Sequence, residues 1–166
     1  MNDSKAPVRP DVSIWMADLL PLIQEAFAQG KDAPIPVTGT SMVPTLLGGR
    51  DRVRLSAPPD VLKKYDLPLY RRQNGQFILH RIVSVEKDGT YTCCGDHQWE
   101  KETGIRRDQI LAVTVQIHRK GKDIPVSSFG YRLWVRFWVM VLPCRRFFLR
   151  VYHGGLKLRK SSRPPQ

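Results

Sequence analysis

The chain has 166 residues, 42% of them hydrophobic and 25% charged, which is typical of one folded domain. Its formal net charge is +12, and residues 129–166 hold nine of the 27 Lys and Arg but none of the 15 Asp and Glu. These numbers exclude a low-complexity chain and place the excess positive charge in the C-terminal segment.

Three cysteines, two of them adjacent, are too few for a disulfide framework, and no Cys/His spacing matches a zinc site. We therefore expect a reducing compartment, no metal and no cofactor. Residues 1–11 lack the basic and apolar regions of a secretory signal, and no run of 18 apolar residues offers a conventional transmembrane helix. Together these features predict a location on the cytoplasmic side.

The hydrophobic pattern predicts a helix first and strands afterwards. Residues 12–29 have the apolar spacing of a short amphipathic helix, in which Pro21 marks the first turn or a kink. Beyond Gly30 the period changes to two, and we expect strands over residues 51–56, 67–72, 76–85, 90–94 and 109–119. Asp88-Gly89 is expected to form a tight turn before residues 90–94, and residues 120–123 are expected to close the last strand.

After about residue 128 the pattern is helical again. The predicted fold class is therefore mainly β, with a small, coiled, antiparallel β domain between a short N-terminal helix and a C-terminal basic amphipathic helix. The β domain is assigned to residues 1–128, and the basic aromatic segment to residues 129–166.

Ser41 lies in the loop sequence GTSMVP, ahead of the first predicted strand. A loop serine most often makes a turn or caps a helix, and that is the alternative to a catalytic role. A nucleophilic serine needs a base within hydrogen-bond reach, donors for an oxyanion and a backbone that exposes its hydroxyl. Gly39 permits close approach of the chain, the amide of Ser41 can donate to an oxyanion, and Pro44 stiffens the end of the loop. These features permit catalysis but do not demonstrate it.

His80 is the candidate base because it lies in the apolar segment FILHRIVSV. On a strand its neighbours on the same face are Ile78 and Ile82, which partly remove the imidazole from water and favour its neutral, proton-accepting form. The alternative is a buried structural histidine with one backbone hydrogen bond. The other histidines are less well placed: His97 after a Gly-Asp pair, His118 beside a turn, and His153 in the basic segment.

These segments resemble the type I signal peptidases, in the branch that uses a Ser-His pair. GTSMVPTL resembles the nucleophile box Ser-Met-x-Pro-Thr, ILHRIVSV resembles the histidine box, and CCGDHQ resembles the Gly-Asp-Asn box with His97 at the asparagine position. RDRVRL, DLPLYRR and IRRDQILAVTVQI resemble the strands of that family, so the resemblance covers residues 35–118. LexA-type self-cleaving repressors share the serine box but use a lysine base, and no lysine lies between Phe77 and Val85.

The resemblance implies a serine endopeptidase with the small β fold of signal peptidases. Ser41 is the implied nucleophile and His80 its general base, and water then hydrolyses the acyl-enzyme. Asp96 corresponds to the aspartate of the Gly-Asp box, and Glu102, with Glu100 as a close rival, corresponds to a second acid. The implied substrate is a peptide bond in a precursor or in a leader or signal peptide.

Two departures from the family pattern bear on these roles. Gly39 replaces the serine that donates to the oxyanion in the lysine branch, so we assign that donation to backbone amides, with Thr40 or Thr38 as weaker candidates. Gly39, Thr40 and Met42 are therefore the expected contacts of the substrate and oxyanion. A second departure is that no N-terminal spanning helix, like the one that tethers housekeeping signal peptidases, is expected from this sequence.

Residues 130–158 predict an interfacial membrane anchor. Arg132, Arg136, Arg146 and Arg150 fall on one side of an ideal helix, and aromatic and apolar side chains surround the rest: Trp134, Phe137, Trp138, Val141, Phe147 and Phe148. Further basic residues favour an anionic lipid surface: Lys157 near the end of this range, and Arg159, Lys160 and Arg163 beyond it. The alternative is a helix that packs on the β domain.

Two other functions stay open. One is an inactive, peptide-binding relative that keeps the fold without the chemistry. The other is a protein that binds nucleic acid or another anionic surface through its basic segment, with nucleic acid the less favoured partner. A steep fall of DNA or RNA affinity with salt is expected only of the second.

Overall fold

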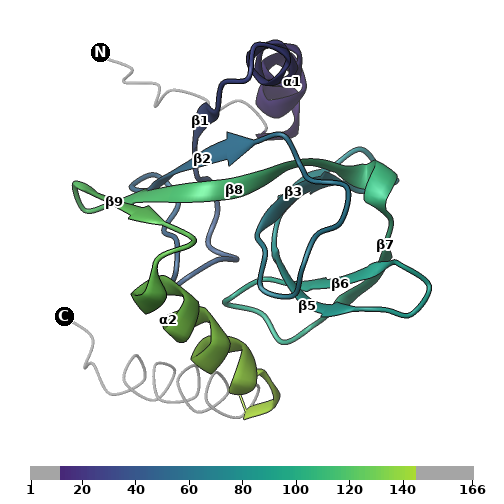
Figure 1. Cartoon of the computed structure of the whole chain (residues 1–166), viewed down its shortest axis with the longest axis vertical. Coiled ribbons are helices and arrows are strands. Elements are labelled where there is room, and N and C mark those ends of the chain that lie inside the picture. The colour runs from purple at the N-terminus through teal and green to yellow at the C-terminus, as the bar shows by residue number, and fades with distance from the viewer. Residues whose placement is uncertain (1–11, 145–166) are drawn as a thin grey trace, which may run out of the picture.

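The computed structural model describes residues 12–144 and contains a β domain between two helices (Figure 1). Helix α1 spans Val12–Ala28 and helix α2 spans Phe129–Met140. The strands between them are β1 Ala33–Pro36, β2 Arg52–Ser56, β3 Pro68–Arg71, β4 Phe77–Leu79, β5 Arg81–Val85, β6 Tyr91–Cys94, β7 Glu102–Ile105, β8 Ile110–Arg119 and β9 Lys122–Pro125, with a 3-10 helix at Arg107–Gln109. The prediction of a mainly β fold with a helix on each side is confirmed.

Helix α1 packs its apolar face on the β domain. Met16 and Ile23, two helical turns apart, are 4% and 3% exposed and belong to the main apolar cluster with residues of β1, β2 and β8. Pro21 lies inside the helix and not in its first turn. The helix ends where Gly30 adopts φ +68°, and its amide donates to the carbonyl of Phe27 at 2.9 Å.

Strand β8 organises the larger sheet, whose order is β1-β2-β8-β3-β4 with β9 also paired to β8. All of these pairings are antiparallel. Val113 pairs with Ser56 of β2 and with Pro68 of β3, so these two strands lie on opposite sides of β8. Both pairings contain a shift in register, the kind of irregularity that bends a sheet. The strands β1 and β4 end this path and are its outer strands.

The expectation of one strand over residues 76–85 is wrong. The structure divides this segment into β4, which pairs with β3, and β5, which pairs with β6 in a separate three-stranded sheet of order β5-β6-β7. His80 lies at the joint, between the last paired residue of β4, Leu79, and the first of β5, Arg81. Apolar residues are frequent in both strands, so the sequence pattern does not reveal the change of partner.

Helix α2 packs on the β domain by one face. Val135 is buried, the indole N–H of Trp138 donates to the carbonyl of Asp96 at 3.0 Å, and Arg81 donates to the hydroxyl of Tyr131 at 3.1 Å. Trp138 is therefore a contact with the domain and does not belong to an exposed aromatic surface. Away from these contacts the helix carries an exposed apolar stripe, which consists of Phe129, Leu133, Phe137 and Met140.

Part of the predicted membrane anchor lies outside the described residues. This applies to Arg146, Phe147, Phe148 and Arg150 and to the basic residues Lys157, Arg159, Lys160 and Arg163. Neither α1 nor α2, the two α-helices that the structure describes, is long and apolar enough to cross a membrane.

Candidate active site

The predicted nucleophile lies in a closed loop over residues 37–51, between β1 and β2. The amide of Gly48 donates to the carbonyl of Gly39 at 3.1 Å, and the amide of Gly49 donates to that of Val37 at 2.9 Å. Gly39 adopts φ +73°, and a Cβ on Gly48 would lie 2.2 Å from the carbonyl oxygen of Gly39. Two glycines are therefore required for the chain to meet itself at the base of this loop.

The inner side of the loop is fixed by burial and hydrogen bonds. Met42 and Leu46 are 3% and 0% exposed and belong to the main apolar cluster. The carbonyl of Thr45 accepts a hydrogen bond from Arg119 at 3.0 Å, and its hydroxyl accepts one from Trp134 of α2 at 3.3 Å. The turn that presents Ser41 is thus held by both β8 and α2.

The loop that follows β6 contacts the backbone of Ser41 directly. The amide of His97 donates to the carbonyl of Ser41 at 2.8 Å. A Cβ on Gly95 would lie 2.7 Å from the same carbonyl oxygen, so only glycine permits this approach without a shift of the chain. The Gly-Asp segment is therefore packed against the serine loop, although the two are far apart in the sequence.

Ser41 and His80 line the same cavity of about 170 Å³. The rest of its lining is mostly apolar. The two outer strands of the larger sheet contribute Ile35 from β1 and Phe77 and Leu79 from β4, and the other apolar residues are Met16 of α1, Met42 and Leu69. The hydroxyl of Ser41 and the ring of His80 make no hydrogen bond with each other or with any other residue in the range 12–144. The cavity thus brings together the predicted nucleophile and the predicted base without joining them.

His80 is 5% exposed, and its ring packs edge-on against that of Tyr70, with centroids 6.4 Å apart. Burial lowers the pKa of His80 to about 4, against the opposing charge of Glu102. The imidazole is therefore neutral at pH 7 and can accept a proton. The alternative is a structural histidine whose ring makes one backbone hydrogen bond. Among the residues described here, the ring of His80 makes no such bond.

The backbone around Ser41 offers donors to a ligand. Among the described residues, the amides of Gly39, Thr40, Ser41 and Met42 donate to no acceptor. Thr38 also lines the apolar cavity, while Thr40 is exposed. Backbone amides without an acceptor, next to a nucleophile, are the usual kind of donor in an oxyanion hole.

Asp96 lies next to Arg81 in a buried ion pair. Its two carboxylate oxygens accept hydrogen bonds from Arg81 Nε at 3.0 Å and Nη2 at 2.7 Å, and the two side chains are 2% and 0% exposed. Arg81 directly follows His80 in the chain. The charge of Asp96 acts to raise the pKa of His80, but its carboxylate is directed at the guanidinium. This geometry gives Asp96 a clear structural contact and an electrostatic effect on His80.

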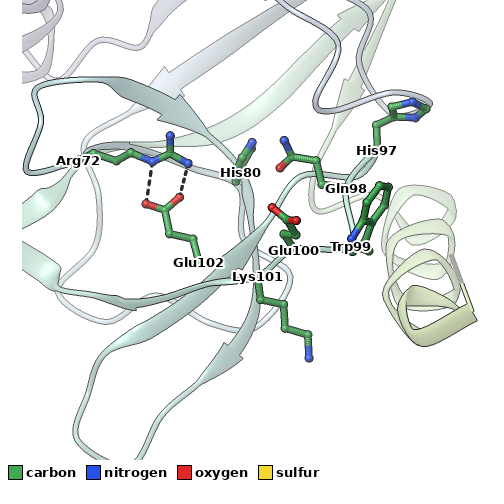
Figure 2. Close-up of a pocket in the computed structure, with 8 residues that line it drawn as sticks. All are labelled: Arg72, His80, His97, Gln98, Trp99, Glu100, Lys101 and Glu102. Carbon is green, nitrogen blue, oxygen red and sulfur yellow. Dashed lines mark hydrogen bonds and ion pairs between the residues drawn. The ribbon is translucent and has the colours of Figure 1, made fainter. Parts of the chain in front are cut away.

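A second, larger cavity of about 500 Å³ lies beside His80 and is shown in Figure 2. Glu102 lines it and accepts hydrogen bonds from Arg72 Nε at 2.8 Å and Nη2 at 2.7 Å and from the Tyr70 hydroxyl at 2.8 Å. Burial acts to raise the pKa of Glu102, but these hydrogen bonds outweigh it, so the pKa lies below its usual value. Glu100 also lines the cavity but is exposed. Of the two glutamates, Glu102 has the ordered environment and the charge that reaches His80.

The sequence interpretation missed two contributors to this site. Met16 of α1 lines the apolar cavity, and its only sequence signal is a place on the apolar face of the helix. Arg72, which holds Glu102, has no signal that identifies its partner. No three His, Cys, Asp or Glu side chains in residues 12–144 are grouped closely enough to hold a metal ion.

Comparisons with protein-family models, with curated proteins and with solved structures found no match for this chain.

Proposed function

We propose that the chain is a serine endopeptidase, similar to the Ser-His signal peptidases, that cleaves a precursor or leader peptide. The observation that carries the proposal is that Ser41 and His80, from separate segments of the chain, line one largely apolar cavity. The buried, neutral state of His80 supports it, because only an uncharged imidazole can take the serine proton.

The chemistry assigns one task to each group. Ser41 Oγ attacks the carbonyl carbon of the scissile bond while His80 accepts its proton. The free amides between Gly39 and Met42 stabilise the negative charge that develops on the carbonyl oxygen. His80 then donates the proton to the departing amine, and water hydrolyses the acyl-enzyme with His80 as base.

The cavity also restricts the substrate. Because it lies between the outer strands β1 and β4, an extended peptide can pair with an unpaired strand edge while one side chain enters the cavity. A volume of about 170 Å³ with an apolar lining favours a small, uncharged side chain before the scissile bond. We therefore assign the chain to substrates that are extended and have a small residue at that position.

A fluorophosphonate probe tests the proposal, because it forms a covalent bond only with an activated serine. We expect one adduct per chain, which mass spectrometry locates on Ser41. The Ser84→Ala variant is a matched control, since Ser84 lies on β5 and is also partly buried, and it should label as the wild type does. An unlabelled wild-type chain that still binds peptides would favour the inactive relative.

We also propose that α2 holds the peptidase at an anionic membrane surface. The exposed stripe of Phe129, Leu133, Phe137 and Met140 supports this, because these side chains have no partner face on the β domain. Arg132 and Arg136 border the stripe and carry the charge that attracts anionic lipid.

Co-sedimentation with vesicles of phosphatidylcholine and phosphatidylglycerol tests this attachment. The Leu133→Gln/Phe137→Gln variant should lose most of the bound fraction, because it removes apolar area from the stripe. A matched control, Leu22→Gln/Val85→Gln, also replaces two exposed apolar residues, on α1 and β5, and should bind as the wild type does. Equal binding of both variants contradicts attachment through α2.

A further inference from the structure

Another cavity, of about 510 Å³, lies between α2 and the loop that connects β2 to β3. Four cationic side chains line it: Lys63 and Lys64 from the loop, and Arg132 and Arg136 from α2. It shares no lining residue with the two cavities beside His80. Its volume is suited to a small ligand, and the proposed peptide cleavage does not use it.

These four cations form no ion pair with a carboxylate in the described part of the chain, where other basic residues make the ion pairs. One acid, Asp66, also lines the cavity. Its carboxylate accepts a hydrogen bond from the amide of Lys63 at 2.7 Å, and burial raises its pKa. One carboxylate against four cations leaves the cavity strongly positive, so it favours an anionic ligand.

Thr114 supplies an independent sign of a ligand in the same cavity. It lies on β8, is 2% exposed and lines the cavity. Its hydroxyl oxygen is the one side-chain oxygen or nitrogen atom that is itself fully shielded from solvent, among the residues that the structure describes, and has no hydrogen-bond partner. Buried hydroxyls are rarely left unpaired because the lost hydrogen bond is costly. A hydroxyl can donate to a phosphate oxygen, so the cavity offers a neutral donor beside its charges.

The cavity borders the exposed apolar stripe of α2. Arg132 follows Phe129 by three residues, and Arg136 follows Leu133 by three, so each cation is the neighbour of a stripe residue on the helix surface. A ligand with an anionic group joined to an apolar chain fits this arrangement. Nucleic acid has the phosphate but lacks the apolar chain, so the stripe favours a lipid.

We propose that this cavity binds the phosphate of an anionic phospholipid, whose acyl chains lie along the stripe of α2. The inference rests on the proposed attachment of α2 to a membrane and does not depend on the peptidase chemistry. The absence of Asp and Glu from residues 129–166, which hold nine Lys and Arg, favours the same partner.

Calorimetric titration of the full chain tests the site with three soluble probes: dihexanoyl phosphatidic acid below its micelle concentration, dihexanoyl phosphatidylcholine and inorganic phosphate. The Lys63→Gln/Lys64→Gln variant should bind phosphatidic acid about thirtyfold more weakly, since two charges near the phosphate are lost. Thr114→Val should also weaken binding while the fold is retained, because it removes a hydroxyl that has no partner within the described chain. The control Lys31→Gln/Lys87→Gln removes the same charge from exposed positions outside the cavity and should leave the affinity unchanged.

Three outcomes of the titrations would overturn the proposed headgroup site. Inorganic phosphate that binds as tightly as phosphatidic acid assigns the site to free phosphate, and a DNA oligonucleotide that displaces the lipid assigns it to nucleic acid. An equal loss in the Lys31→Gln/Lys87→Gln control shows attraction by net charge alone. If the wild type ignores vesicles, the attachment of α2 fails, whereas the soluble probes still decide the headgroup site. Labelling of Ser41 is independent of both results.

Discussion

Substitution of Ser41 or His80 by alanine is expected to lower kcat by about 10³-fold or more, because each removes one member of the nucleophile and base pair. Internally quenched peptides with a small residue before the scissile bond provide the measurement. The double variant should lose no more activity than either single variant, since the two groups act as one unit. The fold should survive in Ser41→Ala, because the hydroxyl makes no hydrogen bond with a residue in the described chain.

The matched control for His80→Ala is His118→Ala. His118 is exposed at the end of β8, where its ring lies 2.8 Å from the carboxylate of Asp123, and it lines neither cavity beside His80. This variant should retain wild-type kcat. Near-normal turnover in His80→Ala would falsify the assignment of the base and leave the apolar cavity as a peptide-binding site.

The pH dependence follows from the burial of His80. Because burial lowers its pKa to about 4, kcat/KM should remain level down to about pH 5 and fall as the pH passes through about 4. The free energy of unfolding should also decrease as the pH falls. In the unfolded chain the histidine has its ordinary pKa of 6.5. Between that pH and about pH 4 it is therefore protonated in the unfolded state but still neutral in the folded state.

The free energy of unfolding of the wild type should therefore decrease below about pH 6.5, by up to roughly 1.4 kcal/mol per pH unit from this residue. His80→Ala should lack this part of the decrease, as chemical denaturation at several pH values can measure. An activity profile with its inflection near pH 6.5 would contradict a buried base.

The sequence predicts the elements whose period is unambiguous. The apolar face of α1, the alternation in β2 and the long β8 are found where they are expected, and Gly89 makes the turn before β6 with φ +82°. Strand β1 is not predicted because two of its four residues are prolines, and β7 is not predicted because only Ile105 of this strand is buried. Weak β propensity in both segments is overcome by pairing with a neighbouring strand.

The candidate site is less accessible to sequence reasoning because its geometry depends on long-range contacts. The residues around Ser41 and His80 suggest chemistry only through their resemblance to a family, and nothing in their period places them beside one cavity. The carboxylates show the same limit. The sequence does not distinguish the environments of Asp96 and Glu102. In the structure, Asp96 forms a buried ion pair with Arg81, and Glu102 forms a partly exposed ion pair with Arg72.

That difference predicts losses of different size for substitutions of the two acids. Asp96→Asn should lower the free energy of unfolding by about 3–5 kcal/mol, because it leaves the guanidinium of Arg81 buried without a counter-ion. Activity should also fall severely, because the segment around Asp96 connects the Ser41 loop to α2. The carbonyl of Asp96 accepts a hydrogen bond from Trp138, and the amide of His97 donates to the carbonyl of Ser41. Chemical denaturation and kcat measured on the same preparations separate the two effects.

Glu102→Gln should give a smaller loss of stability and a measurable loss of kcat. The Arg72 and Glu102 side chains are 33% and 26% exposed, so water compensates part of the lost charge. The substitution also removes the charge that raises the pKa of His80, which makes the imidazole a weaker base.

A double substitution, Arg81→Met/Asp96→Leu, distinguishes structure from catalysis at Asp96. Replacement of both charges by apolar side chains of similar size removes the unpaired cation, so stability should recover relative to Asp96→Asn. If activity recovers with stability, Asp96 acts by holding the loop of His97 against Ser41. If stability recovers and activity does not, the carboxylate itself is needed at His80. Wild-type kcat in Asp96→Asn and Glu102→Gln alike would remove both acids from the mechanism, leaving Ser41 and His80 as a dyad.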